Sequence, residues 1–115
     1  MAESGDAVAT VREVQDEHGY RLVISGRLDV RTAADLRLPM HRAIASGSSA
    51  VLLDLGEAHI GDATGFGLVV EVLRRSHRAG RALLIVAADD RTRRLLRRAR
   101  LGSFLAEEVL TGAVG

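Results

Sequence analysis

The sequence predicts an α/β domain in which a mixed β-sheet is packed by α-helices on one or both faces. Near the N-terminus, two segments of alternating apolar and polar residues flank a short turn, a pattern typical of a hairpin. Residues 50–55 and 81–88 are almost continuously apolar, as central strands covered on both faces are. Amphipathic segments stand between and after these runs. The predicted order is therefore β-β-α-β-α-β-α.

The predicted hairpin occupies residues 11–25. Residues 11–16 form its weaker strand, residues 17–19 the turn and residues 20–25 (YRLVIS) the stronger strand, which residues 26–29 close. The first ten residues are small and polar, and we expect them to be frayed.

A first helix is predicted to begin at Thr32, which has Asp35 three residues later in a capping-box arrangement. Pro39 falls inside this helix and removes a backbone donor, so we expect a kink or a restart there. Residues 46–49 end the helix. Its apolar stripe consists of Leu36, Met40, Ala43 and Ile44.

A second helix is predicted over residues 64–79, and Gly80 is placed to end it. The spacing i, i+3, i+4, i+7 puts four residues on its core face: Phe66, Val69, Val70 and Leu73. On the outward face, Glu71 stands four residues before Arg75, an orientation that stabilises a helix by about 0.3–0.5 kcal/mol. The other arginines of that face are Arg74 and Arg78.

The same helix carries a candidate docking patch. Helical spacing stacks Thr64 and Leu68 on the outward side and places Val72 at its boundary with the core. Gly65 and Gly67 leave the backbone beside them bare. An exposed Leu68 would suit a protein partner or a homodimer, although single exposed leucines are also ordinary on protein surfaces.

A third helix is predicted from Asp89 and Asp90 to Arg100, with acidic residues at its start and arginines at its end. Gly102 is expected to stop it, and residues 103–110 are expected to return as a short edge strand or a strand plus a turn.

The composition excludes several classes of protein. A chain of 115 residues corresponds to one domain, residues 1–115. It has no cysteine, which excludes disulfides and thiolate metal sites. No apolar run approaches the ~20 residues that span a bilayer, and no signal peptide is visible. We therefore expect a cytoplasmic protein with no membrane association.

The basic residues suggest a nucleic-acid-binding alternative. All 16 are arginine, and the formal net charge is +1. Six of them fall in the third predicted helix, where they could neutralise phosphates: Arg91, Arg93, Arg94, Arg97, Arg98 and Arg100. An apolar stripe on the same segment instead describes an amphipathic helix with a solvated face, which could also meet an acidic partner. Aromatic residues make up only 3% of the chain, too few for base-stacking platforms.

The sequence offers no catalytic constellation. Its four histidines, at positions 18, 41, 59 and 77, lack metal-ligand spacing. Of these, His59 is the one to watch because it lies just before Asp62. The nucleophile-elbow, Walker A and dinucleotide-binding glycine patterns are missing. We expect that the protein is not an enzyme and that it has no catalytic residue, no metal and no cofactor.

The first turn of the second helix can carry a charge-sensitive switch. Unpaired N–H groups at a helix N-terminus favour an anion, which Asp62 could supply as a cap. A phosphate on Thr64 would bring a charge of about −1.5 to −2. It would be tolerated locally but would obstruct a docked partner. Asp62 or Thr64 could equally be a simple N-cap.

The segments SGRLDVRTAADL, VLLDLGEAHIGDATGFGLVVEVLRRSHRAGRALLIV and RRLLRRARLGSFL together resemble the STAS domain family, over residues 8–113. The closest likeness is to stand-alone anti-sigma factor antagonists of bacterial partner-switching systems. The resemblance implies a four- to five-stranded mixed sheet packed by three to four helices. It also implies a partner, an anti-sigma factor that is a serine kinase of the histidine-kinase-like ATPase fold. Binding that partner frees the sigma factor.

By position, the resemblance makes Asp62 the aspartate of the family's turn, Gly65 its glycine and Thr64 its second hydroxyl. The family's phosphoacceptor directly follows the aspartate, where this chain has Ala63, and a methyl group accepts no phosphate. Asp29 matches the acidic residue of an early Gly-x-Leu-Asp segment. The predicted partner-binding set is Asp29, Asp62, Ala63, Thr64, Gly65, Leu68 and Val72.

The switch has three interpretations. The protein binds its partner but cannot be silenced at position 63, or Thr64 has taken over as the acceptor. In the third, the domain is a scaffold or a ligand- or nucleotide-binding module in a larger sensory complex.

Overall fold

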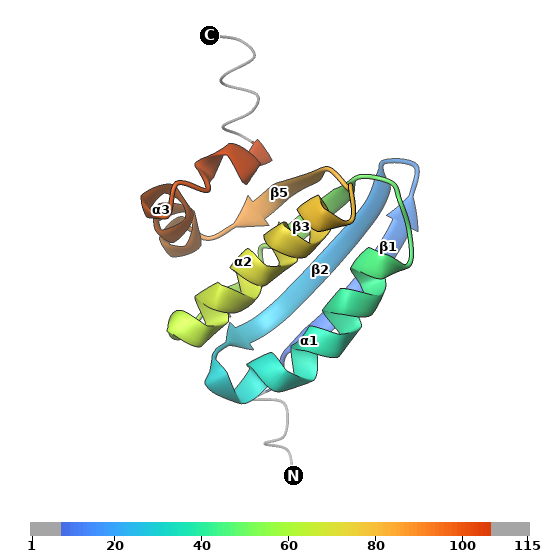
Figure 1. Cartoon of the computed structure of the whole chain (residues 1–115). Helices are drawn as coiled ribbons and strands as arrows, with labels where there is room; N and C mark the ends of the chain where they lie inside the picture. The colour runs from blue at the N-terminus through green and yellow to red at the C-terminus, as the bar shows by residue number, and fades with distance from the viewer. Residues whose placement is uncertain (1–7, 107–115) are drawn as a thin grey trace, which may run out of the picture.

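The computed structural model describes residues 8–106, which form one sheet with helices packed on it (Figure 1). The strand order is β1-β2-β3-β5; β1 is antiparallel to β2, whereas β2, β3 and β5 are parallel. A short strand, β4, pairs in parallel with the end of β2. The elements are β1 (Thr10–Asp16), β2 (Gly19–Leu28), α1 (Val30–Ala45), β3 (Val51–Leu55), β4 (Ala58–Ile60), α2 (Ala63–Arg78), β5 (Leu83–Ala88), α3 (Asp90–Arg98) and the 3₁₀ helix η2 (Gly102–Phe104).

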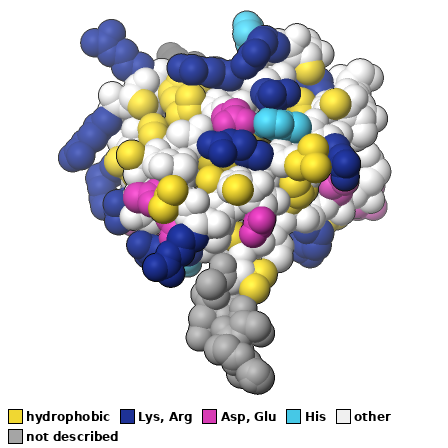
Figure 2. Space-filling view, turned by 60° about the horizontal axis from the view of Figure 1, so that its bottom comes forward, with side chains coloured by type: hydrophobic (Ala, Val, Ile, Leu, Met, Phe, Trp, Pro, Cys, Tyr) yellow, Lys and Arg dark blue, Asp and Glu magenta, His cyan; other side chains and the backbone are white. Residues whose placement is uncertain are grey.

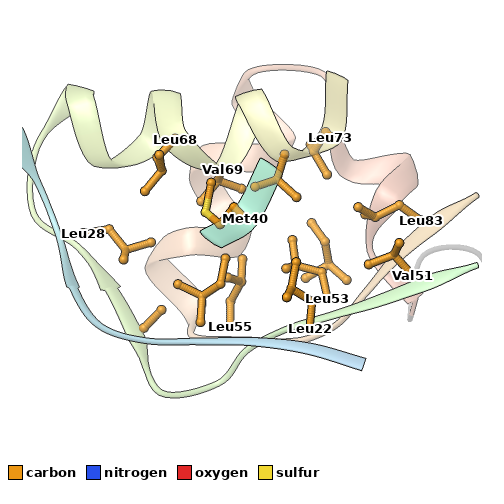
Figure 3. Packing of buried hydrophobic residues seen from close by; sticks show 14 of the residues in the cluster. Leu22, Leu28, Met40, Val51, Leu53, Leu55, Leu68, Val69, Leu73 and Leu83 are labelled. Carbon is orange, nitrogen blue, oxygen red and sulfur yellow. The ribbon is translucent and has the colours of Figure 1, made fainter. Parts of the chain in front are cut away.

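The helices α1 and α2 run side by side over one face of the sheet, with both N-termini at the end of the sheet where β2 finishes (Figure 1). The core fills the space between them and the strands (Figure 3). Leu22 and Leu53 on the strands, Met40 of α1 and Leu68 of α2 all point into this space, and all four side chains are fully buried. The predicted stripe of α1 (Leu36, Met40, Ala43 and Ile44) is confirmed as buried.

The predicted hairpin is confirmed, but β2 continues to Leu28, beyond the predicted end at residue 25. Its extra residues, Gly26 to Leu28, pair with β4. No pattern in the sequence marks β4, because a strand of three residues with one exposed and two buried side chains has no recognisable period. Because β2 extends to Leu28 through this pairing, the chain passes directly from the strand into the start of α1.

The start of α1 differs from the prediction. Asp29, and not Thr32, is its N-cap, and the two residues form a reciprocal capping box with Thr32 at the third helical position. The expected restart at Pro39 is wrong, since α1 continues through it. Pro39 and Asp35, whose carbonyl loses its donor, both lie on the exposed side, where water can serve that carbonyl.

The orientation of α2 also differs from the prediction. Its buried residues are Gly65, Leu68, Val69, Val72, Leu73 and Ser76. Phe66 and Val70, predicted to face the core, are only partly buried. The expected exposure of Leu68 is wrong: it is 1% exposed, and Val72 is fully buried. Both stripes are apolar, so periodicity alone could not choose between them.

The pairing of Glu71 follows from this orientation. Its carboxylate faces α1, with Oε1 3.2 Å from Arg37 Nε and Oε2 2.5 Å from His41 Nε2. It was expected to pair with Arg75. Burial acts to raise the pKa of Glu71, but the contacts with His41 and Arg37 outweigh it and hold that pKa below its ordinary value. This cluster joins the two helices at their outer side.

A buried arginine, which no sequence pattern marks, fastens the far end of α1. Arg81 is 4% exposed and follows the turn that ends α2. Its guanidinium donates to the carbonyls of Ser49 (2.6 Å), Ala43 (3.2 Å) and Ile44 (2.8 Å), and it stacks 5.0 Å from the centre of the Tyr20 ring. Arg81 thus supplies donors to the last turn of α1.

The C-terminal part agrees only partly with the prediction. Asp89 caps α3, but the helix is terminated by Arg100 in a left-handed conformation (φ 63°) and not by Gly102, which begins η2. In the predicted edge strand over residues 103–110, Leu105 makes a single parallel bridge to Ile85. Residues 107–110 lie outside the described part of the chain.

Candidate functional site

The N-termini of α1 and α2 meet, and one carboxylate joins them. Asp62 caps α2 by accepting a hydrogen bond from the Gly65 N–H at Oδ1 (2.9 Å). Its second oxygen, Oδ2, accepts one from the Val30 N–H, the first residue of α1 (3.0 Å). Asp62 therefore stabilises both helix starts and fixes their relative position.

Asp29 holds the start of α1 from the other side. Its Oδ1 accepts hydrogen bonds from the N–H groups of Arg31 (2.9 Å) and Thr32 (3.1 Å), and its Oδ2 accepts one from Arg27 Nε (3.0 Å). Burial acts to raise the pKa of Asp29, but these hydrogen bonds outweigh it and lower that pKa from its usual value. The carboxylate is thus committed to the cap as an anion.

Gly65 permits the close approach of the two segments. A Cβ atom at this position would lie 1.8 Å from the Leu28 carbonyl oxygen and 2.4 Å from its carbonyl carbon, so no other residue fits without a backbone shift. The same carbonyl oxygen accepts a hydrogen bond from the Gly61 N–H at 2.8 Å. Gly65 therefore has a positioning role, since a side chain there would separate the first turn of α2 from the end of β2.

The surface left around these caps is small and mostly apolar. We call it the paired-cap surface: Val30, Ala63, Thr64 and Gly67. Val30 is 65% exposed, Ala63 and Gly67 are exposed, and Thr64 is partly exposed. A Cβ atom on Gly67 would meet nothing within 4 Å, so the outer side of α2 is open there. Figure 2 views this end of the molecule, where arginine side chains surround smaller apolar patches.

Most of the predicted site residues lie together in the structure, and two of them do not belong to the site. Asp29, Asp62, Ala63, Thr64 and Gly65 lie together at the two helix starts. Leu68 and Val72 are buried in the core and cannot belong to this surface.

Val30 belongs to the site although no motif in the sequence points to it. It reaches the paired-cap surface only because the chain turns from β2 into α1 beside Asp62.

His59, which stood out in the sequence by its position before Asp62, lies on β4 and pairs with the cap of α3. Its Nδ1 is 3.4 Å from Asp89 Oδ2. Among residues 8–106, no group of His, Asp or Glu side chains is arranged to hold a metal ion. No helix within these residues has the length and apolar character needed to cross a membrane.

The chain is similar to known proteins in sequence family and in fold. The model of the STAS domain family matches residues 10–110. Unphosphorylated SpoIIAA, an anti-sigma factor antagonist, is 20% identical and has a TM-score of 0.64, with 94% of this chain and 97% of that one covered. Phosphorylated SpoIIAA, described as a Bacillus cell fate determinant, is 19% identical with a TM-score of 0.65, covering 92% and 99%. An anti-sigma factor antagonist from Mycobacterium paratuberculosis is 18% identical with a TM-score of 0.71, covering 95% and 97%.

These likenesses to solved structures concern the fold. They confirm the predicted mixed sheet of four to five strands packed by three to four helices, which in residues 8–106 has five strands and three α-helices. No curated protein matches the sequence.

Proposed function

This chain belongs to the STAS domain family, and on that premise we propose that it is an anti-sigma factor antagonist, a binding protein and not an enzyme. It captures an anti-sigma factor in the bacterial cytoplasm and so frees a sigma factor for transcription. Solved proteins of the same fold carry this description. The observation that carries the proposal is the paired-cap surface, which occupies the place where the resemblance puts the partner contact.

The geometry of this surface supports protein docking. Asp62 bridges the two helix starts, so the surface is rigid before a partner arrives and little conformational entropy is lost on binding. Ala63 and Gly67 are small and stand four residues apart on one side of α2, which lets a partner backbone approach closely. Val30 adds an exposed apolar side chain that a partner pocket could cover.

The partner we propose is an anti-sigma factor with serine kinase activity, and the unusual feature is Ala63. This residue occupies the first position of α2 with an exposed methyl group. Phosphate at this position would meet the positive end of the helix but also the Asp62 carboxylate and any docked partner. Without a hydroxyl at position 63, we propose that binding is not silenced there.

The test is a pull-down and phosphorylation assay against the anti-sigma kinases of the host, with ATP present. The native chain is expected to bind a kinase and take no phosphate. Ala63→Ser is expected to gain phosphorylation and then lose binding. If the native chain is phosphorylated and Thr64→Ala is not, the acceptor has moved to Thr64. If no anti-sigma factor binds the native chain, the proposal is wrong.

A matched pair of substitutions locates the surface. Val30→Glu places a charge on the paired-cap surface, and we expect it to weaken kinase binding at least about tenfold. Val86→Glu is the control, because Val86 is also an exposed valine (41%) but lies on β5. Equal binding by the two variants would place the contact elsewhere.

A further inference from the structure

A groove lies between the C-terminal half of α2 and the segment that follows α3. Its volume is about 480 Å³, within the range of small-molecule sites. The apolar part is formed by Val70 and Leu73 of α2 together with Leu101 and Phe104. The groove shares no residue with the paired-cap surface, so its role does not depend on the proposed function.

The α2 wall of the groove is formed by a second stripe of residues on this helix, beside the stripe that faces the core. Val70, Leu73, Arg74, His77 and Arg78 fall at i, i+3, i+4, i+7 and i+8, and all five line the groove. Leu73 is shared with the core, whereas Val70 is only partly buried. The stripe is apolar toward the middle of the helix and basic toward its end.

The polar part of the lining has one sign of charge. Among the described residues, the polar side chains of the lining are Arg74, His77 and Arg78, all three exposed, and no acidic residue joins them. Guanidinium groups bind carboxylates through paired N–H donors, and two of them stand one helical turn apart at the rim. A neutral apolar ligand would gain no charge contact from these side chains, and a compact anion would leave the apolar floor in water.

We propose that this groove binds an amphipathic anion, specifically an aliphatic carboxylate of medium chain length. The hydrocarbon chain would lie on the partly exposed side chains of Val70, Leu101 and Phe104. The carboxylate would lie between Arg74 and Arg78, with His77 beside it.

The probe is sodium decanoate, titrated into the full-length chain below its micelle concentration and followed by isothermal titration calorimetry. Decanoate is expected to bind at least about tenfold more tightly than decylammonium, which has the same chain and the opposite charge. Octanoate, two methylenes shorter, is expected to bind roughly tenfold more weakly than decanoate. The double variant Arg74→Gln/Arg78→Gln is expected to lose most of the decanoate affinity.

The control is Arg42→Gln/Arg91→Gln, which removes the same charge from exposed arginines that do not line the groove. Val70→Glu is a second test, since it places a negative charge on the floor and should abolish binding. Far-UV circular dichroism checks that each variant is folded. Equal affinities for decanoate and decylammonium, or for the double variant and its control, would overturn the proposal. So would failure of the native chain to bind millimolar decanoate, and light scattering would then show whether a second copy of the chain covers the groove instead.

Discussion

Replacing Gly65 with alanine should separate the two halves of the candidate site. The new Cβ atom would lie 1.8 Å from the Leu28 carbonyl oxygen, so α2 and the end of β2 must move apart by more than an ångström. That movement strains or breaks two hydrogen bonds, Gly61 N–H to Leu28 (2.8 Å) and Val30 N–H to Asp62 (3.0 Å). Each is worth about 1 kcal/mol, and overpacking costs a further ~1–3 kcal/mol. Alanine returns about 1 kcal/mol of helix propensity, which leaves a net loss of about 2–4 kcal/mol.

The matched control is Gly67→Ala, two residues further along the same helix. Nothing lies within 4 Å of a Cβ atom there, so this variant should gain about 0.5–1 kcal/mol. The chain has no tryptophan, so urea unfolding is best followed by circular dichroism at about 222 nm. If both alanine variants unfold at the same urea concentration, the close contact between Gly65 and Leu28 does not exist.

Three further predictions concern the contacts that hold the helices. Arg81→Met should lose about 3 kcal/mol in urea unfolding, because three carbonyl oxygens lose their donor, whereas Arg42→Met on the exposed side of α1 should change stability by less than about 0.5 kcal/mol. Glu71→Gln should cost about 1 kcal/mol near pH 6. Since the folded pKa of Glu71 is lowered, this stabilisation is complete above the unfolded pKa of about 4.3 and is lost as the pH falls through the folded pKa, so the stabilities of wild type and variant should converge at pH values below the folded pKa. Asp62→Ala should cost about 1–2 kcal/mol and expose the Val30 amide to faster hydrogen exchange, with partial rescue by Asp62→Asn; unchanged exchange at Val30 would contradict the bridging role of Asp62.

The parts of the fold that depend on local pattern could be predicted from the sequence. The hairpin follows from two alternating segments and a turn, and the buried stripe of α1 follows from its spacing. The orientation of α2 could not be predicted, because Leu68 and Val72 on one stripe are as apolar as Phe66 and Val70 on the other. Only the packing of the sheet and of α1 against this helix decides between them.

The composition of the candidate site was predicted only in part, since Leu68 and Val72 are buried and Val30 had no sequence signal, and its geometry was not predicted. The resemblance identified Asp29, Asp62 and Gly65, yet it offered no reason for Asp62 to reach the amide of Val30. That contact depends on the pairing of β4 with the last residues of β2, which joins segments about thirty residues apart in the sequence. Glu71 is a similar case. Its sequence spacing predicted a pair with Arg75 on the same helix, but its carboxylate contacts Arg37 and His41 on α1.

The extent of β2 has a consequence for how the domain opens. β2 pairs with β1 along residues 19–25 on one edge, and on the other edge with β3 over residues 20–23 and with β4 over residues 26–28. Within residues 8–106, three of the four other strands therefore depend on it, and only β5 is held through β3. Local opening at β1 or β5 can leave the rest of the sheet intact. Opening at β1 frees only the β2 amides that donate to β1, and we expect the β2 amides that face β3 and β4 to exchange with solvent more slowly. The helix starts that carry Asp29 and Asp62 adjoin β2 and β4, so we expect the paired-cap surface to share the stability of the strand with the most pairing partners in this sheet.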